Sequence, residues 1–499
     1  MFVVLILLTA LLADYAIRVL FLAVERMRVE RPRYPSMGRA ALGRSGELLS
    51  SWVVTLQQIG ACIAYVVIIG DVLHPIVELT GWGSWVCERW PLQLFLLVCV
   101  IFPLCLLPSM DNLKYVSVVS LLLIWGTVFA VVVNGGLVLG DPLRRDQLIG
   151  AEMNATNRTS GVCEHSHSGG SGSGSGGGGM APAPAPAGLF PQEGFLFQNH
   201  SNSTAGGDST SMRMLPKGVG QILSALPILA FAFLCHQNSF PIYKELIDPN
   251  PARMSLVGHW SISICCFVYM LSGLTGYYTF LENTESNLLK NFAVQGTYFS
   301  LPMDVMRTGF GVSMVLSFPL MVWEARHNLD VLIFGDRPYA FWRNFGLNLG
   351  IVGFTGGIGI SVSKLDQVLT VVGSTCSPLM IYILPALFYL APIWGDEKRK
   401  KAGGRASGGD GIEAALMDET EASAAAGVLF NVNGAGPDEV TAAKGGCCGG
   451  CVSERAMVTT MLGYGLLLIP CCLFVWVLQY LVCAEGSAGS SPICSGFGF

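Results

Sequence analysis

Long apolar stretches separated by short polar segments dominate the pattern along this chain of 499 residues. A helix needs about twenty apolar residues to cross the hydrocarbon core of a membrane. Runs near that length predict about ten transmembrane spans, at residues 1–24, 48–79, 91–108, 113–140, 216–236, 258–281, 303–333, 341–363, 367–391 and 456–483. We therefore expect an all-α polytopic membrane protein with membrane lipid around it.

The overall composition agrees with this pattern. Hydrophobic residues make up 52% of the chain and charged residues 13%, which is too apolar for a soluble globule. The net charge of -5 and the absence of a soluble basic domain argue against a nucleic-acid partner. No obligate protein partner is inferred.

Two independent signals predict the orientation. Arginines from Arg26 to Arg44, and the basic residues of the stretch 398–455, predict that both segments are cytoplasmic. Alternating the spans from there places residues 141–215 outside. That stretch contains the four glycosylation acceptors of the chain, which are Asn154, Asn157, Asn199 and Asn202, and glycans are added on the lumenal side.

The two long polar stretches have compositions that favour disorder. Residues 141–215 contain a Gly/Ser run at 169–179 and an Ala-Pro repeat at 181–187, and we expect a disordered, glycosylated external loop. Residues 392–455 are rich in Ala, Gly and acidic residues, which predicts a disordered cytoplasmic loop. Function is therefore expected within the membrane spans.

The stretch from Leu226 to His236, followed by 241–246, is apolar enough for a span but is hard to keep helical. It contains Pro227 and an imidazole, and Pro241 follows shortly after it. Backbone groups freed from helical bonding at membrane depth must face protein, water or a ligand. This pattern predicts a broken helix in the core of a transporter.

Five stretches resemble the signature segments of one family. They are Gln58–Tyr65 for the third helix, Asn112–Ser117 for the turn between the fourth and fifth, Leu226–His236 with Pro241–Leu246 for the sixth, Leu316–Pro319 for the eighth, and Val372–Ser374 with Ile383–Tyr389 for the tenth. In order and spacing they are similar to the sodium-coupled neutral amino acid transporters. That family lies within the amino acid/auxin permease family and the amino acid-polyamine-cation superfamily.

The resemblance implies a leucine-transporter-like fold of two inverted five-helix repeats with an extra C-terminal helix. The repeats would occupy 1–140 and 216–391, and the final helix with a short external tail 456–499. Residue 1 begins directly in the segment that resembles the second family helix, and no segment here resembles the first. We expect it upstream, in an incomplete gene model; a shortened, inactive relative is the alternative.

The same resemblance implies substrate binding at the broken sixth helix. Backbone groups around Ala230, Phe231, Ala232 and Phe233 are candidates for bonding an amino acid's carboxylate or ammonium, and the two aromatic rings for lining its side-chain pocket. Ordinary packing of these two aromatics is the alternative. His236 is a candidate for pH coupling, or for an interfacial cap at the end of its span.

Hydroxyl groups of the eighth span are candidates for a sodium site. Ser313 and Ser317 lie four residues apart on one side of the helix, and Pro319 loosens the hydrogen bonding just upstream. A hard cation prefers oxygen ligands, and the family resemblance places its sodium-site hydroxyl at Ser317. Hydrogen bonds to the same helix or to a neighbouring helix are the alternative.

Further polar residues inside the spans need partners. Gln58 and Tyr65 on the third family helix either line the substrate cavity or bond to another helix. Asp71 is expected near a hydrated external helix end. Glu324 and Arg326 are candidates for an inner gate, or for a charged helix end, and each needs a partner elsewhere because neighbours two apart do not face each other.

These observations favour a secondary active transporter of neutral, or also cationic, amino acids, coupled to sodium or protons through alternating access. An amino-acid sensor of the same fold, without net transport, is the alternative. No nucleotide-binding loop, zinc cluster or hydrolase signature is present, so we expect neither an enzyme nor a cofactor. The plasma membrane is the expected location, with an endolysosomal or vacuolar membrane as the alternative.

Overall fold

The computed structural model describes residues 2–79, 88–107, 114–139, 219–281, 284–292, 300–335, 337–362, 364–394 and 448–477. Within these ranges every regular element is a helix. The four candidate glycosylation sites, Asn154, Asn157, Asn199 and Asn202, lie outside the described residues, as does the whole stretch 141–215.

The first half of the chain contains two long helices, an interrupted short one and a third long one. Their bounds are α1 Phe2–Met27, α2 Tyr34–Leu79, α3 Trp90–Leu96, the π-helical turn η2 Leu97–Ile101, α4 Phe102–Cys105 and α5 Lys114–Leu139. The helix α2 is kinked at Gly43, whose φ of 69° is easily reached only without a side chain. It is longer than the predicted span 48–79, because the helix already begins at Tyr34.

The second half contains the remaining helices. They are α7 Val219–Ala232, α8 His236–Glu245, α9 Pro251–Phe280, the short α10 Leu288–Asn291, α11 Ser300–Phe334, α12 Phe341–Ser361, α13 Leu365–Pro378, the π-helical turn η5 Leu379–Ile383 and α16 Cys448–Val477. After η5 the helix continues to Trp394. The residues at both ends of the predicted cytoplasmic loop 392–455 are thus helical.

Among the described residues, eight helices are long and apolar enough to cross a membrane, and the prediction of a polytopic all-α protein is confirmed. Two of the ten predicted spans differ. The segment Trp90–Cys105 is apolar but shorter than the thickness of a bilayer core requires. The helix α12 has 21 residues but carries Arg343, Asn344 and Asn348 in its first half, which lowers its hydropathy.

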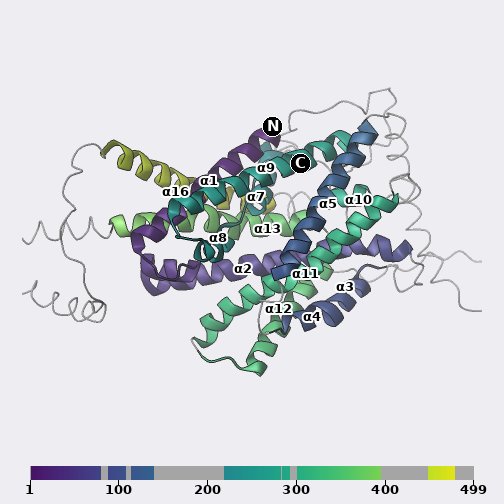
Figure 1. Cartoon of the computed structure of the whole chain (residues 1–499), viewed down its shortest axis with the longest axis horizontal. Helices are drawn as coiled ribbons and strands as arrows, with labels where there is room; N and C mark the ends of the chain where they lie inside the picture. Colours follow the sequence, from purple (N-terminus) through teal and green to yellow (C-terminus); the bar gives the residue numbers. More distant parts are fainter. Residues whose placement is uncertain are drawn as a thin grey trace, which may run out of the picture.

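The two largest of four apolar cores in the described residues join most of the helices. One joins α1, α7, α16 and the segment after α13, and includes Phe21, Phe240 and Phe388. The other joins α2, η2, α11 and α12, and includes Phe318 and Ile351. Figure 1 shows α2 running along the long axis of the molecule, with α5 and α11 crossing it obliquely. The broken segment α7–α8 lies beside the first core.

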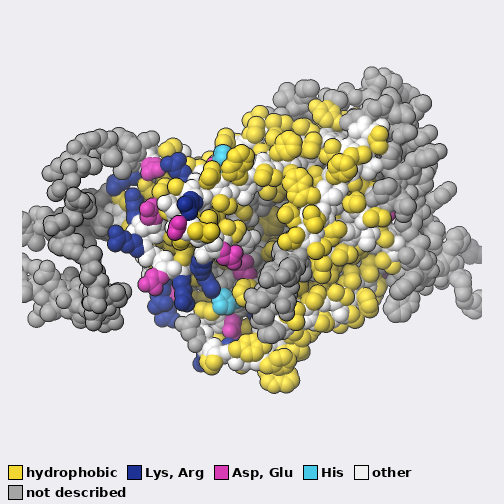
Figure 2. Space-filling view, in the orientation of Figure 1, with side chains coloured by type: hydrophobic (Ala, Val, Ile, Leu, Met, Phe, Trp, Pro, Cys, Tyr) yellow, Lys and Arg dark blue, Asp and Glu magenta, His cyan; other side chains and the backbone are white. Residues whose placement is uncertain are grey.

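The surface has the character expected of a protein surrounded by lipid. Large side chains such as Leu11, Leu122, Phe129 and Leu467 are about two-thirds exposed on their helices. Figure 2 shows hydrophobic side chains over most of the face drawn, whereas Lys and Arg gather at the left end, where α1 ends and α2 begins in Figure 1. This end is the one that the positive-inside rule assigns to the cytoplasm.

Candidate functional site

The helix break predicted from the sequence is present. The chain leaves helical geometry between Ala232, the last residue of α7, and His236, the first residue of α8, with Cys235 at φ -119° and ψ 2°. The break lies slightly later than the residues expected to be free, because Ala230 and Phe231 are still helical. Pro227 is accommodated inside α7, where it removes only its own backbone donor.

A tyrosine of α9 holds the end of α7. The Tyr269 hydroxyl donates a hydrogen bond to the Ala232 carbonyl oxygen over 3.1 Å, and its ring packs edge-on against Phe233, with ring centroids 5.4 Å apart. Phe233 is 3% exposed, whereas Phe231 is half-buried. One of the carbonyl groups that the break releases is therefore satisfied by α9 rather than left vacant.

Hydrogen bonds connect three polar side chains, from α8, α2 and α11, next to the break. Gln237 of α8 donates from Nε2 to Gln58 Oε1 over 3.1 Å, and Gln58 of α2 donates from Nε2 to Glu324 Oε2 of α11. Gln58 is 1% exposed. The sequence predicted that Gln58 needs a partner and that Glu324 needs one elsewhere; the fold makes them partners of each other.

His236 is the first residue after the break. It is 0% exposed, and neither ring nitrogen has a hydrogen-bonding partner within the described residues. The helix α8 continues for nine more residues to Glu245, so His236 lies within the apolar segment Gly220–Glu245 rather than at its end. An imidazole buried in this way is a candidate for a role that needs a polar group in the core.

Tyr65 packs on a different apolar core from the residues at the end of α7. It packs on the second core, which also contains Cys62 of α2 and Phe318 of α11, whereas Ala230 and Phe233 belong to the first core. The predicted substrate residues are thus spread over both cores, and Gln58 is the one that connects to α8 through a hydrogen bond.

The serines of α11 face α5. Ser317 Oγ lies 3.3 Å from Ser120 Oγ, and Ser313, one turn earlier, is 0% exposed with no partner for its Oγ in the described part of the chain. Ser120 was not singled out from the sequence, because nothing in the local pattern of α5 shows which side meets α11. Two hydroxyls one turn apart on α11 and one hydroxyl on α5 are thus candidates for oxygen ligands.

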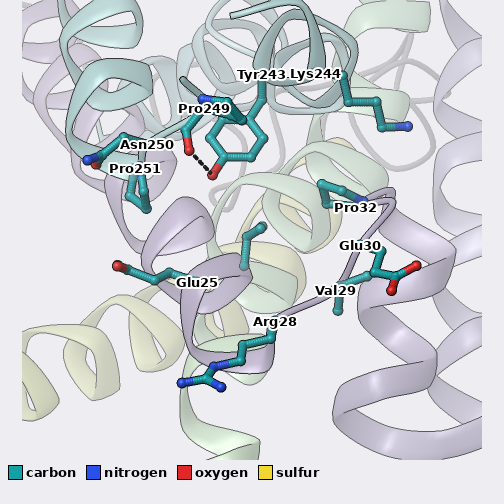
Figure 3. Close-up of a pocket in the computed structure, with 11 residues that line it drawn as sticks. Glu25, Arg28, Val29, Glu30, Pro32, Tyr243, Lys244, Pro249, Asn250 and Pro251 are labelled. Carbon is teal, nitrogen blue, oxygen red and sulfur yellow. Dashed lines mark hydrogen bonds between the residues drawn. The ribbon is translucent and has the colours of Figure 1, made fainter. Parts of the chain in front are cut away.

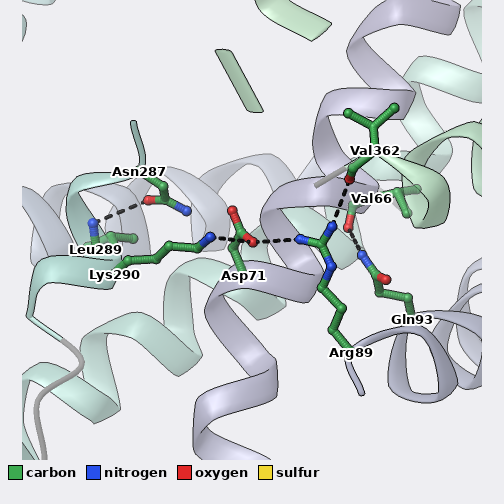
Figure 4. Close-up of polar contacts among 8 residues, drawn as sticks. All are labelled: Val66, Asp71, Arg89, Gln93, Asn287, Leu289, Lys290 and Val362. Atoms are coloured by element: carbon green, nitrogen blue, oxygen red, sulfur yellow. Dashed lines mark hydrogen bonds and ion pairs between the residues drawn. The ribbon is translucent and has the colours of Figure 1, made fainter. Parts of the chain in front are cut away.

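Asp71, in the C-terminal part of α2, lies in a cluster of charged side chains. Asp71 Oδ1 lies 3.1 Å from Arg89 Nη1 and 3.0 Å from Lys290 Nζ, and the Asp71 side chain is 3% exposed (Figure 4). Arg89 also donates to the Val362 carbonyl oxygen over 2.9 Å. The expected hydrated position for Asp71 is therefore wrong, because two cations, one from the start of α3 and one from α10, cover it.

A surface cavity of about 450 Å³ lies away from the break, at the basic end of the molecule. It is lined by the end of α1, the segment before α2, the end of α8 and the start of α9 (Figure 3). The ring of Tyr243 and the prolines face its centre, while Arg28, Glu30 and Lys244 point outward. None of the residues predicted to bind substrate lines this cavity.

The geometry is that of a polytopic membrane protein with a broken helix surrounded by buried polar side chains, which is the arrangement of a transporter. The sequence profile described as transmembrane amino acid transporter protein matches residues 1–147 and 199–403. This chain belongs to that family, so it is an integral membrane protein and a transporter rather than an enzyme.

Curated relatives agree with this assignment. The sodium-coupled neutral amino acid transporter 4 of Rattus norvegicus is 26% identical over 410 residues, and that of Mus musculus is 28% identical over 416 residues. The protein of the same name from Pongo abelii is 26% identical over 398 residues. Each of the three alignments covers 78% of this chain and 72% of the relative.

Proposed function

We propose that this protein is a secondary active transporter that carries neutral, and also cationic, amino acids together with sodium by alternating access. The observation that carries the proposal is the break between Ala232 and His236, inside a segment of a membrane transporter family. The printed names of the relatives favour sodium over protons as the main coupling ion. The broken helix would belong to the second of two inverted repeats, at 216–391.

The proposed substrate site lies along the end of α7. Ala230 and Ala232 present small side chains, so a ligand can approach the backbone there, and Phe231, which is only half-buried, is placed to contact an apolar substrate side chain. Opening of the Tyr269 bond would free the Ala232 carbonyl oxygen for the substrate's ammonium group. Gln58 and Tyr65 of α2 would complete the polar wall.

The proposed sodium site uses Ser313 and Ser317 of α11, with Ser120 of α5 as a third oxygen donor. Sodium binding there would draw α5 and α11 together. Since α11 also packs along α2, the state of the cation site would reach Gln58 and the helix break. This gives a physical route by which an ion gradient drives the movement of a substrate.

The test is concentrative uptake. Cells expressing the full chain, or liposomes that contain it, would be given labelled alanine, serine, glutamine and lysine in sodium medium and in sodium-free medium. We expect accumulation above the external concentration only with an inward sodium gradient, and its loss when the gradient is dissipated. Ligand binding without accumulation would support the sensor instead.

Surface labelling of the same cells tests the proposed plasma-membrane location, and glycosidase treatment tests the predicted external glycans.

A further inference from the structure

Glu324 lies in the inner half of α11, inside a membrane span, and forms no salt bridge with any side chain of the described residues. Its carboxylate is instead hydrogen-bonded by the neutral amide of Gln58. The charged form of a group at this depth costs desolvation free energy. A neutral hydrogen-bonding partner offsets little of that cost. Its position therefore favours a role in which the group gains and loses its charge.

The hydrogen bonds continue from Glu324 to the helix break. Gln58 Oε1 accepts from Gln237 Nε2, and Gln237 is the second residue of α8. Gln237 is 8% exposed, and its Oε1 atom has no partner within the described residues. The two amides thus form a relay between α11 and the start of α8, with one unused acceptor at the far end.

We propose that Glu324 is a proton-binding site, and that Gln58 and Gln237 transmit its state to the helix break; this rests on the proposed transport function. An ionised carboxylate can only accept, so both amides point their donors toward Glu324, as observed. When one proton adds to the carboxylate from water, the neutral carboxyl donates to Gln58 Oε1. The two amides then turn over, and Gln58 Nε2 donates to the free Gln237 Oε1.

This reversal needs no movement of the backbone, and it uses the acceptor that lacks a partner in the ionised state. The reversal changes the atom of Gln237 that bonds to Gln58 from Nε2 to Oε1. The strength of the contact between the first turn of α8 and α2 changes with it. The same proton returns to water when Glu324 ionises again. Glu324 also lies two turns from Ser317 on the same side of α11, about 10 Å along the axis. Proton binding is therefore placed between the proposed cation site and the break.

Charged groups around Glu324 come from few elements. Arg33, in the segment before α2, is the nearest basic residue, and its Nη1 atom lies 2.8 Å from His327 Nε2 of α11. Arg326 turns away and donates to the Cys105 carbonyl oxygen over 3.3 Å. The Arg343 guanidinium of α12 is paired with Asp330 over 2.7 Å.

The other packed helices bring little further charge. The sequence of α2 has no Asp, Glu, Lys, Arg or His between Glu47 and Asp71, and that of α5 has none after Lys114. In the segment 97–105 there is none either. The thiols Cys62 and Cys105 and the phenol Tyr65 are uncharged near neutral pH. The acidic and basic residues of α8 are His236, Lys244 and Glu245.

The first experiment measures uptake against internal pH. Liposomes containing the full chain would be given labelled alanine, serine and glutamine with a fixed sodium gradient and fixed external pH. We expect wild-type uptake to change several-fold, within the limit of about tenfold per pH unit set by one proton. Glu324→Gln should give sodium-dependent uptake without this change, and Gln237→Leu should do the same. Asp330→Asn, on the same helix, should keep the wild-type profile.

The second experiment does not depend on transport. Infrared difference spectra between acid and neutral pH should show a protonated carboxyl band that Glu324→Gln removes, while Gln237→Leu and Asp330→Asn keep it. A protein that shows this band but takes up no amino acid would retain the proton site and overturn the proposed function. A band and a pH profile that are both unchanged in Glu324→Gln would overturn the proton site. A lost band with an unchanged pH profile would overturn its coupling to transport.

Discussion

The hydroxyl oxygens of Ser317 on α11 and Ser120 on α5 lie 3.3 Å apart, in contact across two helices separated by nearly two hundred residues of sequence. The buried hydroxyl of Ser313 is one turn away and has no partner within the described part of the chain. A polar group left unpaired inside a protein costs free energy unless something else binds it. A sodium ion would satisfy all three oxygens at once.

Ser317→Ala should therefore raise the sodium concentration for half-maximal uptake by roughly five- to tenfold, since one oxygen ligand is lost. Ser120→Ala should shift it in the same direction. Ser272→Ala is the control, because the Ser272 hydroxyl bonds the Val268 carbonyl oxygen of its own helix α9. The measurement is uptake against external sodium. An unchanged sodium dependence in both Ser317→Ala and Ser120→Ala would contradict the proposed sodium site.

Tyr269→Phe tests whether the end of α7 is held in place by α9. Loss of the hydroxyl leaves the Ala232 carbonyl oxygen without its donor and should lower the free energy of unfolding by about 1 kcal/mol. Because the freed carbonyl is the proposed ammonium ligand, the concentration of substrate for half-maximal uptake should also change. Tyr278→Phe is the matched control on the same helix. Equal substrate dependence in both variants would show that the bond is structural only.

Gly373→Ala tests the close approach of α13 to the broken helix. A Cβ atom at Gly373 would overlap the carbonyl oxygen of Pro227 in α7, and backbone cannot move aside as a flexible side chain does. We expect a loss of stability of about 1–3 kcal/mol and a fall in uptake. Gly353→Ala in α12 is the control, since no atom lies within 4 Å of its added methyl group. There the substitution should be neutral or stabilising by up to about 1 kcal/mol.

Asp71→Asn tests the charge cluster at the outer end of α2. The substitution leaves Arg89 and Lys290 close together without the anion between them. We expect a loss of about 2 kcal/mol, less than for a fully buried pair because both cations are partly exposed. Thermal unfolding in detergent measures the effect. Asp248→Asn should have almost none, because its pair with Arg253 is open to solvent on both sides; a similar loss in both variants would contradict the prediction.

The sequence predicted the long helices because a helix that crosses a membrane needs a continuous apolar run, whether its side chains face lipid or other helices. The runs at 1–24, 303–333 and 367–391 match α1, α11 and the segment from α13 to Trp394 within a few residues. It also predicted the interruption before His236, because two prolines and an imidazole are unfavourable in one continuous span. These features depend on local composition, which is readable along the chain.

Pairings between helices could not be predicted in this way. Gln58 and Glu324 were recognised as polar groups that need partners, whereas Asp71 was expected at a hydrated helix end. Which partners these residues have depends on how α2 and α11 are rotated and on where the connecting segments return. Gln237, Ser120, Arg89 and Lys290 carried no distinguishing signal, since each is an ordinary polar residue in its own segment. Only their positions in the fold give them a role.

The sequence by itself determined the class of protein, the main spans and the place where one helix breaks, because hydrophobic length and proline act locally. Tertiary structure alone decided that the Glu324 carboxylate meets an amide relay to the break, and that Ser317 meets Ser120. The physical reason is that membrane depth is encoded by each residue's own side chain, whereas a hydrogen bond between helices depends on the packing of both.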